Sequence, residues 1–254
     1  YKMNRLSKKL SFPKESFNTL SNIETKNWWF LSRNKIISWI LTSKVTQFDR
    51  FLEIGCGTGF VLNHLSRCFP NTQFFGSELH AEGLEIAKYR NKGLKFSNLD
   101  ARHLREIEMY DVIGAFDVLE HIKEDQLVLN NLYKAIKANG HLIITVPQHP
   151  SLWSSLDERS FHCRRYTRTE LTEKLRISGF KTLYSSSFVT FLLPLMYISR
   201  KFKQNPQTDI ISEFEITPTT NFFLKCIMNL EISLLKLGIC WPLGGSLLIL
   251  TQKT

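Results

Sequence analysis

Phe51-Leu52-Glu53-Ile54-Gly55-Cys56-Gly57-Thr58-Gly59 is an apolar stretch that runs into three glycines on alternate positions. Glycine has no Cβ, so its backbone can touch a ligand directly and can adopt the positive φ of a tight strand-to-helix turn. A dinucleotide fingerprint, G-x-G-x-x-G, would place a further glycine at position 60 or 62, which hold Phe60 and Leu62. The stretch therefore predicts a strand and a turn that bind a nucleoside ligand without a pyrophosphate.

Three further segments follow at the spacing of a doubly wound fold. Glu78 ends an apolar stretch about twenty residues beyond the glycines, where such folds place the acid that accepts hydrogen bonds from ribose hydroxyls. Asp100 follows a short strand, although an Asp after a strand is also ordinary turn chemistry. A buried strand that ends at Phe116 then leads into Asp117-Val-Leu-Glu-His121.

This set of motifs resembles the class I S-adenosylmethionine-dependent methyltransferases. The resemblance implies S-adenosylmethionine as cofactor and S-adenosylhomocysteine as product. It places the backbone of Gly55 and Gly57 against the amino-acid part of the cofactor, Glu78 on the ribose and Asp100 on the adenine. The cofactor-binding residues that it implies after the N-terminal segment are Glu53, Gly55, Cys56, Gly57, Gly59, Glu78, Leu79, Asp100, Ala101, Phe116 and Asp117.

The N-terminal segment Glu24-Thr-Lys-Asn-Trp-Trp-Phe-Leu-Ser-Arg33 is similar to the aromatic-then-arginine segment of ubiquinone-pathway O-methyltransferases. In those relatives the arginine reaches the carboxylate of the methionine part of the cofactor, a task that a planar guanidinium suits. We therefore expect Arg33 to bind the cofactor. A surface arginine on a helix is the alternative, and the neighbouring Trp28, Trp29 and Phe30 fit a core equally well.

The middle of the chain alternates strands and helices, which predicts an α/β fold with a doubly wound, mostly parallel sheet. We expect strands near 50–54, 73–78, 94–97, 111–116, 141–146 and 180–188, and helices over 124–138 and 167–179. By the resemblance, residues 245–253 form a seventh, antiparallel strand between the fifth and sixth. The predicted divisions are an N-terminal helical cap (1–45), a methyltransferase core (46–187 and 245–254) and an inserted apolar helical segment (188–244).

Residues 146–167 form a loop rich in titratable groups after the fifth strand. The loop resembles the Trp-Ser…Asp…His-x-Arg-Arg-Tyr segment of a bacterial subgroup found in cell-envelope and polyprenoid-type metabolism. Methyl transfer to a hydroxyl requires a base that removes its proton. His162, Asp157 and His149 are the candidate catalytic residues. Hydrogen bonds that only shape the loop, such as one from Arg165 to Asp157, are the alternative.

The segment 188–244 begins with the apolar run 188–198, which Arg200, Lys201 and Lys203 follow. This run is too short to span a bilayer, which takes about 20 residues. Three interpretations stay open: a lid over the acceptor pocket, a helix that rests on an anionic membrane surface, or a core segment at the sheet edge.

The formal net charge is +10, but the basic residues are spread over the whole chain. A nucleic-acid partner is therefore not expected, and no metal site is predicted, because the five cysteines lack C-x-x-C spacing. We expect a cytoplasmic enzyme, peripheral on the inner face of the membrane, that methylates a small or lipid-linked acceptor at oxygen. An RNA or protein methyltransferase, and a non-catalytic S-adenosylmethionine-binding protein, are the alternatives. The oligomeric state is not predicted.

Overall fold

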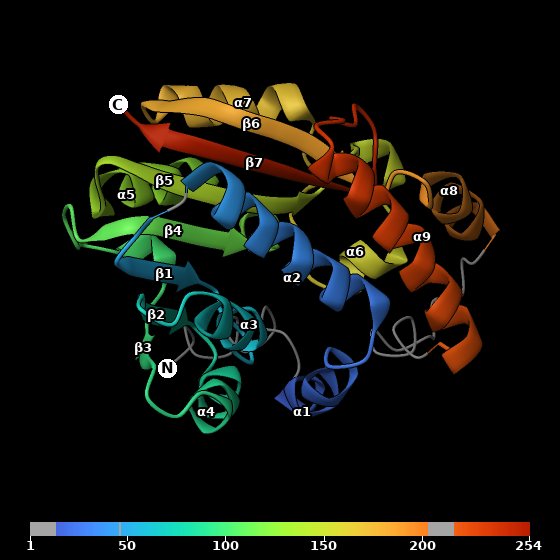
Figure 1. Cartoon of the computed structure of the whole chain (residues 1–254), viewed down its shortest axis with the longest axis horizontal. Helices are drawn as coiled ribbons and strands as arrows, with labels where there is room; N and C mark the ends of the chain where they lie inside the picture. Colours follow the sequence, from blue (N-terminus) through green and yellow to red (C-terminus); the bar gives the residue numbers. More distant parts are fainter. Residues whose placement is uncertain (1–13, 46, 203–215) are drawn as a thin grey trace, which may run out of the picture.

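The computed structural model describes residues 14–45, 47–202 and 216–254, and its centre is a seven-stranded sheet. The strand order is β3-β2-β1-β4-β5-β7-β6, and β7 is antiparallel to both neighbours while the other pairs are parallel (Figure 1). The strands are β1 (Arg50–Ile54), β2 (Gln73–Glu78), β3 (Lys95–Asn98), β4 (Tyr110–Phe116), β5 (Ile136–Pro147), β6 (Phe180–Phe188) and β7 (Ser246–Lys253). This is the predicted doubly wound fold, with the last strand between the fifth and sixth as expected.

Helices cover both faces of the sheet because successive strand residues point to opposite sides. In β1, Phe51 packs in one buried cluster and Leu52 in the other. The Phe51 cluster joins the sheet to α2 (Trp28–Ile40), α3 (Phe60–Cys68) and α9 (Pro218–Lys236). The Leu52 cluster joins it to α5 (Asp125–Ala135) and α7 (Arg168–Ile177). The remaining α-helices are α1 (Lys14–Ile23), α4 (Ala81–Arg90), α6 (Ser155–Arg159) and α8 (Leu193–Phe202).

The predicted helix over 124–138 was too long at its C-terminal end. Helix α5 ends at Ala135, because Ile136 is fully buried and already pairs with Tyr110 in the sheet. Asn139 has a positive φ of 63° and turns the chain before regular pairing with β4 resumes at His141. Asn139 therefore lies in a turn inside the segment of β5, beyond the end of the helix.

The N-terminal helix α2 and the C-terminal helix α9 lie side by side across one face of the sheet (Figure 1). Asn221 links them, since its side chain accepts from the backbone N–H of Trp28 and donates to the carbonyl of Lys26. None of the helices within the described residues combines the length and apolar character needed to cross a bilayer. Lys203 lies outside the described residues, and the predicted division into cap, core and insertion stays a prediction.

Candidate functional site

The glycine turn after β1 is left-handed at each of its three glycines. The φ angles of Gly55, Gly57 and Gly59 are 63°, 52° and 70°. A Cβ on Gly55 would lie 2.6 Å from a methyl group of Val118, whereas a Cβ on Gly57 would meet nothing within 4 Å. Glycine is therefore required at Gly57 for its backbone conformation, and the space above it is open to a ligand.

A cavity of about 810 Å³ opens beside this turn, at the carboxyl ends of β1, β4 and β5. Its size falls within the range of small-molecule sites. The cofactor residues predicted from the sequence that line it are Arg33, Glu53, Gly55, Cys56, Gly57, Phe116 and Asp117. The structure thus brings these residues together around one space, as the motifs predicted.

Arg33 lies among carboxylates at the charged end of the cavity. Its Nη1 donates to Asp117 Oδ2 at 2.6 Å, and its guanidinium carbon lies 4.7 Å from the centre of the Trp29 ring. Glu53 is buried in β1, and burial raises its pKa well above the usual value although the charge of Arg33 opposes the shift. Arg33 Nε and Glu53 Oε2 are both buried and have no hydrogen-bond partner among the described residues.

These unpartnered groups fit the amino-acid part of S-adenosylmethionine, which carries a carboxylate, an ammonium and a sulfonium. Arg33 Nε can donate to the carboxylate, and Glu53 can accept from the ammonium once it is ionised. Buried polar atoms without partners are costly in a closed protein, so a ligand that satisfies both would bind favourably here. The residues present therefore fit the cofactor that the sequence motifs imply.

Glu78 and Asp100 do not line the cavity. Glu78 accepts from the backbone N–H of Gly57 at 2.8 Å and from that of His80 at 2.9 Å, so it holds the glycine turn in place. Asp100 accepts from the backbone and guanidinium of Arg102. Burial acts to raise the pKa of Asp100, but the bonds and charge of Arg102 outweigh it and lower the pKa overall.

The contacts of Glu78 with ribose and of Asp100 with adenine stay predictions. The other predicted cofactor residues that lie away from the cavity are Gly59, Leu79 and Ala101.

Cys56, in contrast, lines the cavity but is buried, and burial together with Glu53 raises the pKa of its thiol. The thiol is therefore protonated at neutral pH and is a poor nucleophile.

The three catalytic candidates take different positions. His162 lines the cavity, and its Nδ1 lies 2.9 Å from Asp157 Oδ1. Asp157 is fully buried and also accepts from Arg165 and from Ser154, so it positions its neighbours and does not line the cavity. His149 is also outside the cavity lining, and burial followed by the charge of Arg165 lowers its pKa. The predicted hydrogen bond between Asp157 and Arg165 is present alongside the contact with His162, and catalytic roles stay predictions.

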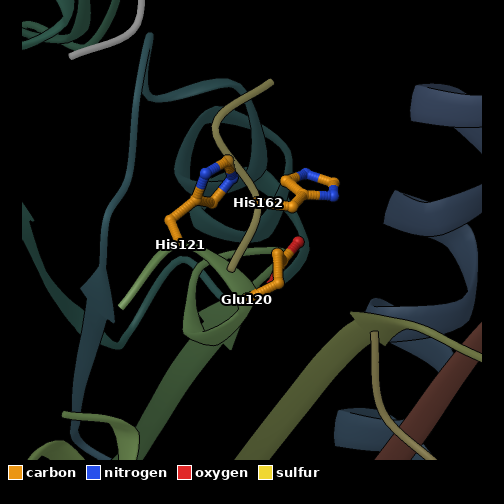
Figure 2. Close-up of side chains that lie close together, drawn as sticks. All are labelled: Glu120, His121 and His162. Atoms are coloured by element: carbon orange, nitrogen blue, oxygen red, sulfur yellow. The ribbon is translucent and has the colours of Figure 1, made fainter. Parts of the chain in front are cut away.

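Glu120 and His121 line the cavity but were not among the predicted site residues. Both belong to the short 3-10 helix η4 (Leu119–His121) after β4, and both line the cavity next to His162 (Figure 2). Burial raises the pKa of Glu120 well above its usual value, and the charge of Asp117 adds to the shift. Although part of His121 reaches solvent, desolvation of its ring and the proximity of His162 lower its pKa. An adjacent Glu-His pair at the end of a strand was the signal in the sequence.

The opposite wall of the cavity is apolar. Helix α8 contributes its face that carries Leu195 and Met196, and α9 contributes Leu224. Trp28 and Leu192 extend this wall toward α2 and the start of α8. The cavity therefore has a charged end at the glycine turn and an apolar end under α8 and α9.

Known proteins similar to this chain are methyltransferases. Residues 52–142 match the family model described as a methyltransferase domain. A malonyl-[acyl-carrier protein] O-methyltransferase from Bacillus cereus is 33% identical over 102 residues, which are 39% of this chain and 38% of that protein. A ubiquinone biosynthesis O-methyltransferase from Vibrio cholerae is 28% identical over 102 residues, 38% of this chain and 41% of that protein. The chain thus matches about two fifths of the length of these relatives.

The fold also matches solved structures. The structure of phosphoethanolamine N-methyltransferase 2 from Haemonchus contortus, in complex with S-adenosyl-L-methionine, superposes with a TM-score of 0.57 at 17% identity. That match covers 87% of this chain and 52% of the other. Residues 52–142 thus form a methyltransferase domain, and the glycine turn and the sheet topology of the chain are similar to those of S-adenosylmethionine-dependent methyltransferases.

Proposed function

We propose that this protein transfers a methyl group from S-adenosylmethionine to an oxygen atom of a small or lipid-linked amphipathic acceptor. The observation that carries the proposal is one cavity with two unlike ends. The charged end is formed by Arg33, Glu53 and the glycine turn, and the apolar end lies under α8 and α9. A cofactor with charged groups and an acceptor with an apolar tail could meet in this space.

The cofactor would supply an electrophilic methyl group on a sulfonium sulfur. Asp117 and, once it is ionised, Glu53 line the cavity and would stabilise the positive charges of the cofactor. Helices α2 and α6 border the cavity and limit the access of water. Orientation of the two reactants and exclusion of water are the main contributions that a methyltransferase fold makes to the rate.

Methylation at oxygen is favoured by the side chains between the two ends of the cavity. Glu120, His121 and His162 form a polar wall there, and such groups can hold or deprotonate a hydroxyl. Both curated relatives named above are O-methyltransferases by name. Their acceptors differ, and the chain spans less than half of either protein, so the acceptor is proposed by chemical class alone.

An amphipathic acceptor is favoured by the shape of α8. Leu195 and Met196 line the cavity, and Leu195, Tyr197 and Ile198 on this helix are all exposed. Exposed apolar groups beside an apolar pocket are suited to a membrane surface from which a lipid-linked acceptor could enter. We include attachment to a bilayer surface in the proposal, in place of the lid and core interpretations of this segment.

The experiment that tests the proposal follows the methyl group. The purified chain is incubated with methyl-labelled S-adenosylmethionine and a cell extract divided into lipid, small-molecule, protein and RNA fractions. We expect label in the lipid or small-molecule fraction, in a product whose methyl group is bonded to oxygen by mass spectrometry. A boiled sample of the chain is the control.

Other outcomes contradict the proposal in different ways. Label in RNA or protein would favour the alternative classes of methyltransferase. Label on nitrogen or carbon would refute methylation at oxygen but keep the enzyme class. Tight cofactor binding with no label in any fraction would favour a binding protein without catalysis.

A further inference from the structure

Glu120, His121 and His162 form a compact group of metal-ligating side chains on the cavity wall (Figure 2). Each offers one potential ligand atom, and these atoms all lie within 4.8 Å of one another. The two imidazole rings meet edge to face with their centres 4.7 Å apart. Ligand atoms around a tetrahedral Zn²⁺ are separated by roughly 3.4 Å for bonds near 2.1 Å. Small side-chain rotations would therefore close the group around an ion.

The buried carboxyl group of Glu120 has one oxygen without a hydrogen-bond partner in the part of the chain that the structure describes. The residue is 1% exposed, and its Oε2 has no hydrogen-bond partner among the described residues. The positive charges of Arg165 and Arg33 act on Glu120 electrostatically. However, Arg165 is hydrogen-bonded to Asp157, and Arg33 is hydrogen-bonded to Asp117. A buried carboxylate is costly unless it is paired or coordinates a metal. A cation held by the two histidines would supply that partner.

His162 is oriented as a metal ligand is. Its Nδ1 is hydrogen-bonded to the buried carboxylate of Asp157, which leaves Nε2 for a ligand. Histidines that bind metals almost always donate their other N–H to a carboxylate or a carbonyl, which fixes the tautomer and the ring orientation.

We propose that Glu120, His121 and His162 bind one divalent transition-metal ion of the Zn²⁺ type at the wall of the acceptor cavity. Two imidazole nitrogens and one carboxylate, with a further position open toward a cavity, form the donor set of catalytic zinc sites. Mg²⁺ prefers oxygen ligands in an octahedral arrangement, so this donor set disfavours it.

The open position gives the ion a role in the reaction, and this part rests on the proposed function. The acceptor hydroxyl coordinates the ion, which lowers the pKa of the hydroxyl, and its proton passes to solvent. The oxygen then attacks the methyl carbon, an O–C bond forms, the C–S bond breaks and its electron pair stays on sulfur. The products are the methylated acceptor and neutral S-adenosylhomocysteine.

The first test measures metal binding without turnover. The full chain is stripped with EDTA, freed of the chelator and titrated with Zn²⁺ in competition with a chromophoric chelator. We expect one Zn²⁺ per chain, with affinity reduced at least about a hundredfold in Glu120→Gln and in His162→Ala. Asp157→Asn should weaken binding by roughly ten- to a hundredfold, the cost of losing an outer hydrogen bond to a ligand.

His64→Ala is the matched control, because His64 lies outside the cavity and its Nε2 is 3.7 Å from the thiol of Cys68, a His-Cys pair that could also attract zinc. It should leave the affinity unchanged. Equal affinity in all variants, loss in His64→Ala, or no stoichiometric binding by the wild type would overturn the proposal. In the last case the contact between His162 and Asp157 is available for general-base catalysis without a metal.

A second measurement does not depend on whether the variants fold. X-ray absorption of the wild-type chain loaded with one Zn²⁺ should show two imidazoles and a carboxylate oxygen around the ion. Sulfur in the first coordination sphere would refute the site. Failure of the proposed function would look different, since Zn²⁺ would still bind while no methyl transfer occurred with or without the ion.

Discussion

Arg33 is the residue on which the charged end of the cavity depends. It contacts Asp117 directly, stacks on Trp29, and its charge opposes the raised pKa of Glu53. Replacing it by an apolar residue would leave two acids without a cation in a poorly hydrated space. The identity of this residue therefore affects both the stability of the cavity and its ability to bind a carboxylate.

Glu78 is predicted to contribute to cofactor binding both directly and through the glycine turn. Glu78→Ala removes the acceptor of the Gly57 N–H and the predicted contact with ribose. We expect the affinity for S-adenosylhomocysteine to fall by about tenfold to over a hundredfold, which corresponds to roughly 1.5–3 kcal/mol for a charged hydrogen bond. Titration calorimetry measures it, with Glu85→Gln on the exposed side of α4 as control. Unchanged affinity would remove Glu78 from the site.

Single residues of the glycine turn could be predicted, because a tight strand-to-helix turn demands glycine at particular positions. Gly55 and Gly57 adopt the positive φ that their spacing implied. Glu120 and His121 could not be assigned in the same way, because their partner His162 lies about forty residues later. Only the fold brings η4 and the loop after β5 together, so the metal-ligating group becomes visible in the structure.

At the scale of elements, the strands were predictable and the ends of helices less so. Strands β1, β2 and β6 occupy the predicted ranges because their buried apolar runs are bounded by turn residues. The early end of α5 was not predictable, since it depends on the pairing of Ile136 with Tyr110 across the sheet. Here the tertiary contact of Ile136 ends the helix before the predicted boundary at residue 138.

Glu231 in α9 links this helix to the start of the α8 segment. One carboxylate oxygen accepts from the backbone N–H groups of Thr190 and Phe191, and the other is buried without a partner among the described residues. Burial raises the pKa of Glu231, although these N–H groups act in the opposite direction. The carboxyl group therefore keeps its proton in the folded chain at a pH where the unfolded chain has lost it.

This difference predicts a pH-dependent stability. Above the usual Glu pKa of about 4.3 the unfolded state binds fewer protons, so stability falls as pH rises until the folded pKa is passed. Glu231→Gln has no charge to bury, so the stability of the wild type relative to this variant should decline over that window and then level off. Thermal unfolding followed by circular dichroism measures it. Glu85→Gln is the exposed control, and a difference independent of pH would contradict the assignment.

Helix α8 lies beyond the strand ends, while α9 runs beside α2 across one face of the sheet (Figure 1). Both helices contribute residues to the cavity lining. Exposed apolar side chains occur on both helices, including Tyr197 and Ile198 on α8 and Phe222 and Phe223 on α9. The sequence predicted an apolar segment here but left its role open, because its hydropathy fits a lid, a core segment and an interfacial helix alike. The structure exposes part of that surface beside the apolar wall, which supports the membrane proposal.

The membrane proposal predicts binding to anionic vesicles at low salt. Changing Tyr197 and Ile198 together to Ser should weaken binding by about tenfold or more, since burial of one large aliphatic side chain contributes roughly 1.5–3 kcal/mol. Co-sedimentation with vesicles measures the change. The matched control changes the exposed Tyr89 and Ile107, which lie outside α8 and α9, to Ser. Equal binding by both double variants, or no binding by the wild type, would refute the interfacial role.

Calorimetric titration of the wild-type chain with S-adenosylhomocysteine tests whether the cavity beside the glycine turn binds S-adenosylmethionine. The structure predicts one site per chain. Adenosine alone should bind more weakly, because it lacks the amino-acid group that Arg33 and Glu53 are placed to meet. At about 1 mM ligand, the titration detects binding free energies of about 4 kcal/mol or more. If a folded chain bound neither S-adenosylhomocysteine nor S-adenosylmethionine at this concentration, the cavity would not be a cofactor site.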